Sequence, residues 1–347
     1  MKGVSFAVIA IIALLGVLGV ISYSVYQFSY GGYGVAQPKS AEEDISRTKL
    51  ELTKTALSQN LKFASHQAMI TAGAQGGTAY PTTYWWCNSQ PQPPSPNEFA
   101  FVLSNFSLNN FNAYINAYKE DKTIRQMNIT VEDYRCININ NPGKENCLGR
   151  DSRYCEWFRA GTVGGSNIEV HSPSYKSYFG EIEGTMDSNR GYWLYWNLYD
   201  AAKNKNLLIR VITQSFQERC PGPEDPLTKL KIAIEDVCPA FEKLFDEYVK
   251  CSYEILCLGE GASCLNTPCE RDPLDKLCSE GGGFMPSETI KRKPEGISLQ
   301  RGTASARIKF IFTDYKYNIP SNVGMIPLKF IMMASLEAGE QECRPID

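Results

Sequence analysis

Twelve cysteines are the residues of this 347-residue chain best suited to covalent chemistry. No two of them stand in a Cys-x-x-Cys pair, the spacing with which metal-binding cysteines usually hold one ion. We therefore predict disulfide bonds and folding in an oxidising compartment. The predicted disulfide cysteines are Cys87, Cys136, Cys147, Cys155, Cys220, Cys238, Cys251, Cys257, Cys264, Cys269, Cys278 and Cys343. Their pairing does not follow from spacing, and two alternatives stay open: a zinc site within Cys251 to Cys278, and reduced, buried thiols.

Groups suited to acid–base or nucleophilic catalysis are few. The chain has only two histidines, His66 and His171, and neither belongs to an HExxH motif. Histidine is the side chain whose proton affinity best suits catalysis near neutral pH, so a histidine-dependent hydrolase is disfavoured. Glu181 and Glu183 can share one face of a strand, but such pairs are expected by chance among 38 acidic residues. We predict no catalytic residue, no metal site and no cofactor, and hence no enzyme.

Clustered aromatic residues offer a second kind of chemistry, because flat rings can stack on sugars or bases. Trp85 and Trp86 lie in the segment 80–96, which we interpret as an irregular loop, a linker or surface flap, from its prolines. Tyr192, Tyr195 and Tyr199 recur at helical spacing with Trp193 and Trp196 beside them. Packing in a hydrophobic core is the favoured role of the second cluster, and ligand binding is the alternative.

Two sequons mark possible N-glycosylation, at Asn105 (Asn-Phe-Ser) and at Asn128 (Asn-Ile-Thr). The net charge is −3, from 35 Lys and Arg against 38 Asp and Glu. Because no basic tract is present to neutralise phosphates, nucleic acid is not an expected partner.

An apolar run from Val4 to Ile21 follows Met1-Lys2-Gly3. As a helix it would extend about 27 Å, close to the thickness of the hydrocarbon layer of a bilayer. We predict a single transmembrane helix with the lipid bilayer as partner. Lys2 is the only nearby charge on the short side, which places the N-terminus in the cytoplasm and the C-terminal domain outside the cell membrane. A cleaved secretory signal peptide ending at Ala36 is the alternative.

The residues Lys2-Gly3-Val4-Ser5 and the apolar helix after them resemble the class III signal of archaeal type IV pilins and pilin-like proteins. The resemblance covers about the first 25 residues. It implies cleavage by a prepilin peptidase between Gly3 and Val4, and packing of the apolar helix with copies of itself or with other pilin-like subunits. Two features differ: Phe6 stands where many of these proteins have proline, and the stretch 31–38 breaks the helix that pilins usually continue.

Periodicity predicts the elements of the remaining chain. Apolar residues at steps of three, four and seven predict a long amphipathic helix that begins near Ser40 and ends before Gly73, its stripe packed on the domain's own sheet. Segment 95–118 predicts two short helices or one kinked helix. Strands are predicted at 127–131, 136–139, 167–170 and 207–216, and alternation predicts an antiparallel hairpin over 308–336 that turns at 320–324. From 226 onward, a helical region leads into a Gly-rich loop that holds Cys251 to Cys278.

The fold class predicted is α+β: an N-terminal transmembrane helix, a long amphipathic helix, then a mixed α/β extracellular domain with antiparallel strands and a Cys-rich helical region. The predicted divisions are 1–28 for the signal and anchor, 29–40 for a Gly/Pro hinge, 41–225 for the α/β ectodomain, 226–284 for the Cys-rich helical subregion and 285–347 for the C-terminal hairpin that completes the ectodomain. The function predicted is that of a membrane-anchored extracellular structural or adhesive protein, with a pilin-like filament subunit as its specific form. A signal-anchored ligand-binding ectodomain, for carbohydrate for example, is the alternative, and an anchored enzyme is third.

Overall fold

The computed structural model describes residues 39–79, 84–120, 129–133, 137–140, 158–162, 168–171, 176–179, 182–186, 190–219, 224–265, 303–321 and 324–339. The predicted transmembrane segment Val4–Ile21 and the cleavage site Gly3/Val4 lie outside these residues. Within the described ranges, no helix is both long enough and apolar enough to cross a membrane.

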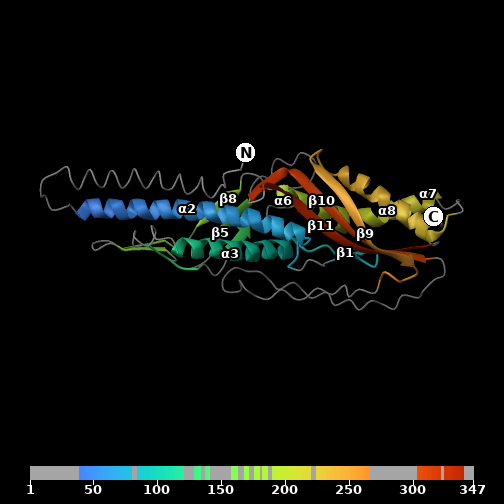
Figure 1. Cartoon of the computed structure of the whole chain (residues 1–347), viewed down its shortest axis with the longest axis horizontal. Coiled ribbons are helices and arrows are strands. Elements are labelled where there is room, and N and C mark those ends of the chain that lie inside the picture. The colour runs from blue at the N-terminus through green and yellow to red at the C-terminus, as the bar shows by residue number, and fades with distance from the viewer. Residues whose placement is uncertain are drawn as a thin grey trace.

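The described chain is α+β, with an antiparallel-dominated main sheet. Its helices are α2 (Lys39–Ala74), α3 (Pro96–Glu120), α6 (Arg190–Lys203), α7 (Leu207–Arg219) and α8 (Pro226–Glu242). Its strands are β1 (Tyr84–Cys87), β2 (Gln90–Pro91), β3 (Ile129–Val131), β4 (Ile137–Asn140), β5 (Phe158–Thr162), β6 (Ile168–His171), β7 (Lys176–Phe179), β8 (Glu183–Met186), β9 (Val249–Glu260), β10 (Thr303–Ser321) and β11 (Gly324–Gly339). Helices α2 and α3 lie together toward one end of the molecule, and the main sheet lies with α7 and α8 toward the other (Figure 1).

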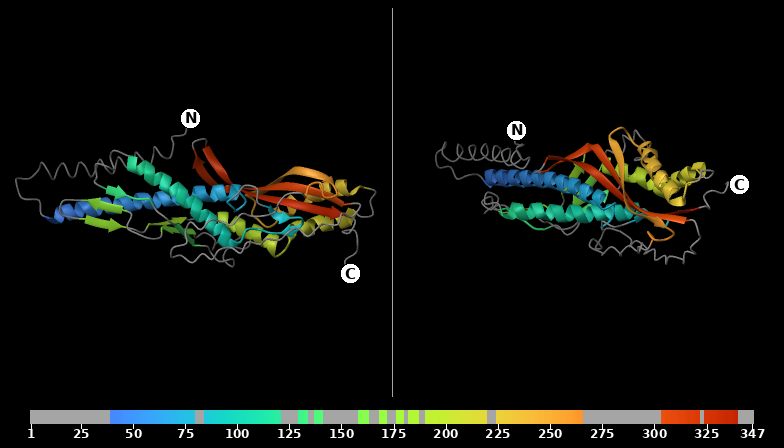
Figure 2. Two further views of the ribbon diagram at one scale, coloured as in Figure 1. Left: turned by 90° about the horizontal axis from the view of Figure 1, so that it is seen from below. Right: turned by 45° about the vertical axis from the view of Figure 1, so that its right-hand side comes forward.

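Helix α2 is the predicted long helix, and its apolar stripe is buried. The stripe consists of Leu50, Leu57, Leu61, Ala64 and Ala68. The helix packs along α3 and reaches strand β11, as the two views of Figure 2 show. The prediction that the stripe packs within the domain is therefore confirmed. The helix begins at Lys39, close to the predicted start, but the predicted end before Gly73 is wrong, because the helix includes Gly73 and ends at Ala74.

The C-terminal end of α2 makes a close approach to the backbone of β11. A Cβ atom on Gly73 would lie 2.6 Å from the carbonyl oxygen of Lys329, and one on Gly76 would lie 2.6 Å from that of Ile331. Gly76 also has a φ of +72°, a left-handed conformation that favours glycine. Glycine at these two positions allows the helix to end against the strand without a clash.

Helix α3 is one continuous helix, so the two-helix alternative for this segment is wrong. It begins with a capping box: the Ser95 hydroxyl accepts from the Glu98 N–H, and the Glu98 carboxylate accepts from the Ser95 N–H, both at 3.2 Å. Phe99, Leu103, Phe111 and other apolar residues at helical spacing bury one side against the core.

The main sheet has the strand order β2-β1-β11-β10-β9. Strands β10 and β11 form the predicted antiparallel hairpin, and they pair from Thr303↔Gly339 to Ser321↔Gly324. Its inward row is fully buried as expected: Ile308, Phe310, Phe312, Leu328, Phe330, Met332, Ala334 and Leu336. Ile326, which we expected in that row, is 38 % exposed, because it lies near the tip of the hairpin.

Strand β1 corrects the prediction of an irregular loop or surface flap over 80–96. It pairs in parallel with β11, and Trp85 and Trp86 are both fully buried. The indole N–H groups donate to the Gly76 carbonyl at 2.8 Å and to the Asn206 side chain at 3.1 Å. Hydrogen bonds for both indoles explain why two tryptophans can enter the core here.

Helix α8 packs against β9, β10 and β11, α7 packs against α8, and α6 contacts both α7 and β11. Helix α7 contradicts the strand predicted over 207–216. In α7 the buried residues Leu208, Ile212 and Phe216 recur every four positions, which is the period of a helix face. The helical region predicted from 226 onward is helix α8. Asp225 is its N-cap and accepts from the Thr228 N–H at 2.6 Å, and Pro239 lies inside this helix.

Strand β9 corrects the prediction that Cys251 and Cys257 lie in a Gly-rich loop. All of its twelve residues except Leu256 pair antiparallel with β10, and it forms one end of the main sheet. Two further three-stranded sheets, β3-β6-β7 and β4-β5-β8, contain the predicted strands at 127–131, 136–139 and 167–170, with boundaries shifted by one or two residues.

Candidate functional site

A partly buried cluster of charged and polar side chains joins four separate elements. It consists of His66 from α2, Arg190 from the start of α6, Asp246 from the turn between α8 and β9, and Asp314 and Tyr317 from β10. We call it the Arg190 junction. At Asp314 the pairing of β10 with β9 ends, and the pairing of β10 with β11 shifts register between Asp314 and Asn318. The junction therefore occupies an irregularity in the sheet, where a strand re-aims its side chains.

Arg190 binds both carboxylates at once. Its Nε and Nη2 donate to Asp314 at 2.6 and 3.2 Å. Its Nη1 and Nη2 donate to Asp246 at 2.8 and 2.9 Å. The Arg190 side chain is 14 % exposed and that of Asp314 is 0 % exposed. The Arg190 guanidinium also lies 4.6 Å from the centre of the Trp193 ring, a cation–π contact.

Electrostatics in the junction favour the charged forms of its ion pairs. Burial would raise the pKa of Asp246, but hydrogen bonds from Arg190 and the charge of Arg190 outweigh it, so the pKa is lowered from its ordinary value of 3.8. Burial likewise opposes the Arg190 charge, yet the two carboxylates raise the pKa of Arg190 overall. Asp314 further accepts from the Lys316 N–H at 2.9 Å.

Tyr317 extends the junction to the long helix. Its ring is nearly buried, and its hydroxyl contacts His66 Nδ1. Burial, followed by the nearby charge of Asp314, raises the pKa of Tyr317, so the hydroxyl keeps its proton at neutral pH and can donate it to Nδ1. The arrangement thus holds α2, α6 and β10 together by directed polar contacts.

The junction has the chemistry of a structural site. An ion triad and a Tyr–His hydrogen bond connect the elements that pack around it. Among the described residues, no three His, Cys, Asp or Glu side chains are grouped as a metal ion would require. A hollow of about 320 Å³ on the surface is lined by Arg47, Thr48, Glu51, Leu52 and Thr55, all from α2, so a single helix forms it.

Two disulfides lie at strand β9, and both confirm predicted disulfide cysteines. Cys238 of α8 bonds Cys251, and Cys257 bonds Cys264 in the turn after the strand. Cys87 is disulfide-bonded as well. These bonds exclude zinc ligation by Cys251, Cys257 and Cys264. The remaining predicted cysteines, Cys136, Cys147, Cys155, Cys220, Cys269, Cys278 and Cys343, lie outside the described residues.

The aromatic clusters named as possible ligand platforms belong to the core. Trp85 and Trp86 are fully buried, and Tyr192, Tyr195 and Trp196 are between 0 and 6 % exposed. The favoured core role of the second cluster is confirmed. Burial raises the pKa of Tyr192, and its ring packs edge-on against Phe99.

The modification sites predicted from the sequence are only partly within the described chain. Asn105 lies in the middle of α3, half-buried, and Ser107 of its sequon is fully buried. Asn128 and the processing residues Gly3 and Val4 lie outside the described residues, as does Glu181 of the acidic pair. Glycosylation and processing therefore stay predictions.

Sequence reasoning missed the Arg190 junction, although one signal was available. Ile308, Phe310 and Phe312 alternate inward along β10, and Asp314 occupies the next inward position. A carboxylate in a buried row needs a partner, because an unpaired charge in the core is costly. That signal predicts a buried cation but does not say which one.

Comparison with known proteins adds no relative. No protein-family model, no curated protein and no solved structure matches this chain.

Proposed function

We propose that the protein is a membrane-anchored extracellular structural or adhesive protein, and that its specific form is a pilin-like subunit. Its N-terminus is cytoplasmic, and one helix at Val4–Ile21 spans the cell membrane. Its partners are the lipid bilayer and, in a filament, copies of itself or other pilin-like subunits. The protein is not an enzyme in this proposal.

The observation that best supports the proposal is the packing of helix α2 against the main sheet. This helix is the first described element after the predicted anchor, and its 36 residues extend about 54 Å. Its stripe is buried over most of that length, Gly73 and Gly76 lie directly on β11, and His66 contacts Tyr317 of β10. A helix packed in this way would fix the sheet in position relative to the anchor, which suits a structural role.

The disulfides support the extracellular location in the proposal. Described cysteines from α8, β9 and the turn after β9 are joined in pairs, and such bonds persist in oxidising compartments. The rival proposal of a carbohydrate-binding ectodomain has less support, since the named tryptophans, Tyr192 and Tyr195 are buried in the core and Tyr199 is half-buried against it.

The deciding experiment is to identify the N-terminal residue of the mature protein from its native host. The pilin-like proposal expects Val4, because removal of Lys2 lets the apolar helix leave the bilayer for a filament core without carrying that charge. Replacing Gly3 by Trp should block processing and leave membrane insertion intact. A mature chain that begins at Met1 indicates a plain signal anchor, and one that begins at Gln37 indicates a secreted protein.

The anchor itself has a separate test. The full-length protein should stay with membranes during alkaline carbonate extraction, because a spanning helix is held by its apolar length. Deleting residues 4–21 should release a soluble product with intact disulfides. Full-length protein in the soluble fraction would refute the anchor.

A further inference from the structure

The free edge of β9 is the part of the sheet where another strand can add. Strand β9 ends the order of described strands, and the Cys251 N–H donates to the Glu242 carboxylate at 2.8 Å, away from β10. Because N–H groups alternate in direction along an antiparallel strand, those of Tyr253 and Ile255 also point to the free edge. No hydrogen bond to a described residue occupies these two N–H groups.

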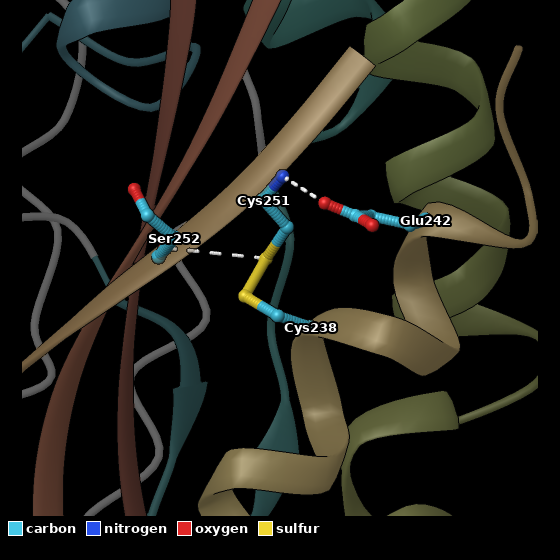
Figure 3. The surroundings of a disulfide bond; sticks show 4 residues. All are labelled: Cys238, Glu242, Cys251 and Ser252. Atoms are coloured by element: carbon cyan, nitrogen blue, oxygen red, sulfur yellow. Dashed lines mark hydrogen bonds between the residues drawn. A yellow bond between two sulfur atoms is a disulfide. The ribbon is translucent and has the colours of Figure 1, made fainter. Parts of the chain in front are cut away.

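Glu242 closes one position on this edge. Cys238 and Glu242 lie four residues apart on α8, so both face the same place on β9. Cys238 forms the disulfide with Cys251, and Glu242 accepts the N–H of the same residue, as Figure 3 shows. The disulfide holds the end of α8 beside the strand and keeps the carboxylate in position.

The charges of β9 complement a second copy of the same strand. If two β9 strands pair antiparallel with Ser252 opposite Ser252, then Lys250 of each copy lies opposite Glu254 of the other. Cys251 then lies opposite Tyr253, and their edge-facing N–H and C=O groups can exchange two hydrogen bonds. Shifting the register by two residues in either direction loses both opposite-charge pairs.

We propose that the β9 edge is a strand-addition site for β9 of a second copy, and that Glu242 keeps it closed. The carboxylate occupies the Cys251 N–H that the incoming strand needs. Loss of this contact frees the Cys251 N–H and so completes a row of three edge-facing donors with Tyr253 and Ile255. The register shift between Ile255 and Cys257 limits the pairing to the first half of β9. The proposal concerns the edge of the sheet and does not depend on the predicted anchor.

The experiment uses full-length protein in detergent micelles and Ser252→Cys as a reporter. In the proposed register the two introduced thiols lie opposite each other in a non-hydrogen-bonded pair, a geometry compatible with a disulfide between copies. E242A should raise the dimerisation constant, measured from the cross-linked S252C dimer at low protein concentration, by about a hundredfold, which is about tenfold for the charge-assisted hydrogen bond lost in each of the two copies. E242Q, whose amide oxygen still accepts the N–H, should stay closed.

Matched controls distinguish the effect of the Glu242 contact from general effects of substitution on cross-linking. E247A removes an exposed carboxylate from the adjacent turn and should leave cross-linking unchanged. In the E242A background, K250C alone should not cross-link, whereas K250C with E254C should. E242D, one methylene shorter, also withdraws the carboxylate, so it serves if E242A fails to fold. Equal cross-linking of S252C in wild type, E247A and E242D, or self-linking of K250C as efficient as that of S252C, would overturn the proposal.

Discussion

Removal of Arg190 tests whether the Arg190 junction stabilises the fold. The substitution Arg190→Met keeps an unbranched, flexible side chain and removes the charged guanidinium that faces Asp246 and Asp314. Asp314 is 0 % exposed, so its carboxylate is left buried without its ion-pair partner. Breaking a buried ion pair by removing one partner typically costs about 3–5 kcal/mol. The Lys316 N–H still donates to Asp314, so we expect the lower end, about 3 kcal/mol.

The assay is urea unfolding with the disulfides intact, followed by tryptophan fluorescence, together with a thermal scan. At about 2–4 °C per kcal/mol for a domain of this order of size, R190M should lower Tm by about 6–12 °C. R210M is the control, because Arg210 is exposed on α7 and its loss should change stability by less than about 0.5 kcal/mol. The double variant R190M/D314L should recover much of the loss, since an apolar pair can replace a buried ion pair.

Two results would refute this reasoning. A loss in R190M no larger than in R210M would mean that the buried carboxylate needs no cation. A double variant less stable than R190M alone would mean that Asp314 acts by contacts other than its pairing with Arg190.

Further predictions concern charge, backbone conformation and covalent bonds. Above about pH 4, the free energy of unfolding of wild type should exceed that of D246N, because Arg190 stabilises the ionised Asp246 carboxylate and lowers its pKa in the folded state. The difference should vanish as the pH falls through that lowered pKa and the carboxylate is protonated. Urea midpoints at pH 7, 5 and 3 check this. G76A should lose about 1–3 kcal/mol, since its φ is +72° and a Cβ would meet the Ile331 carbonyl, whereas the exposed T71A should lose less than about 0.5 kcal/mol. A non-reducing digest should contain peptides joined through Cys238–Cys251 and Cys257–Cys264, and reduction should add ~2 Da per bond; alkylation of these four cysteines without reductant would contradict it.

The parts of the fold that could be predicted are those where hydrophobic period and length agree. The stripe of α2 and the alternation in β10 and β11 each continue over many residues, and their burial follows the period closely. In α7 two signals conflict. Val211, Ile212 and Thr213 favour a strand by composition, but the step of four from Leu208 to Ile212 belongs to a helix.

Strands β1 and β9 were not predicted, because prolines, glycines and cysteines in these segments suggested loops and the alternation of apolar residues was given less weight. Val249, Cys251, Tyr253 and Ile255 alternate with polar residues as a half-buried strand does, yet cysteines near glycines suggested a loop. For β1, four residues between prolines and turns carry too little period to show a strand. Its place is set by tertiary contacts, which bury both tryptophans and satisfy their indole N–H groups with Gly76 and Asn206.

The Arg190 junction marks a different limit, because its members have no local relation. Arg190 stands 56 residues from Asp246 and 124 from Asp314, so no periodicity links them. What the sequence contains is a requirement: Asp314 in an inward row needs a cation. Many Lys and Arg residues can meet that requirement, and the choice depends on where α6 begins relative to β10. Gly191 contributes to that placement, since a Cβ there would overlap Met69 of α2. The packing of helices on the sheet thus determines which residue pairs with a buried charge. The local sequence shows only that such a charge needs a partner.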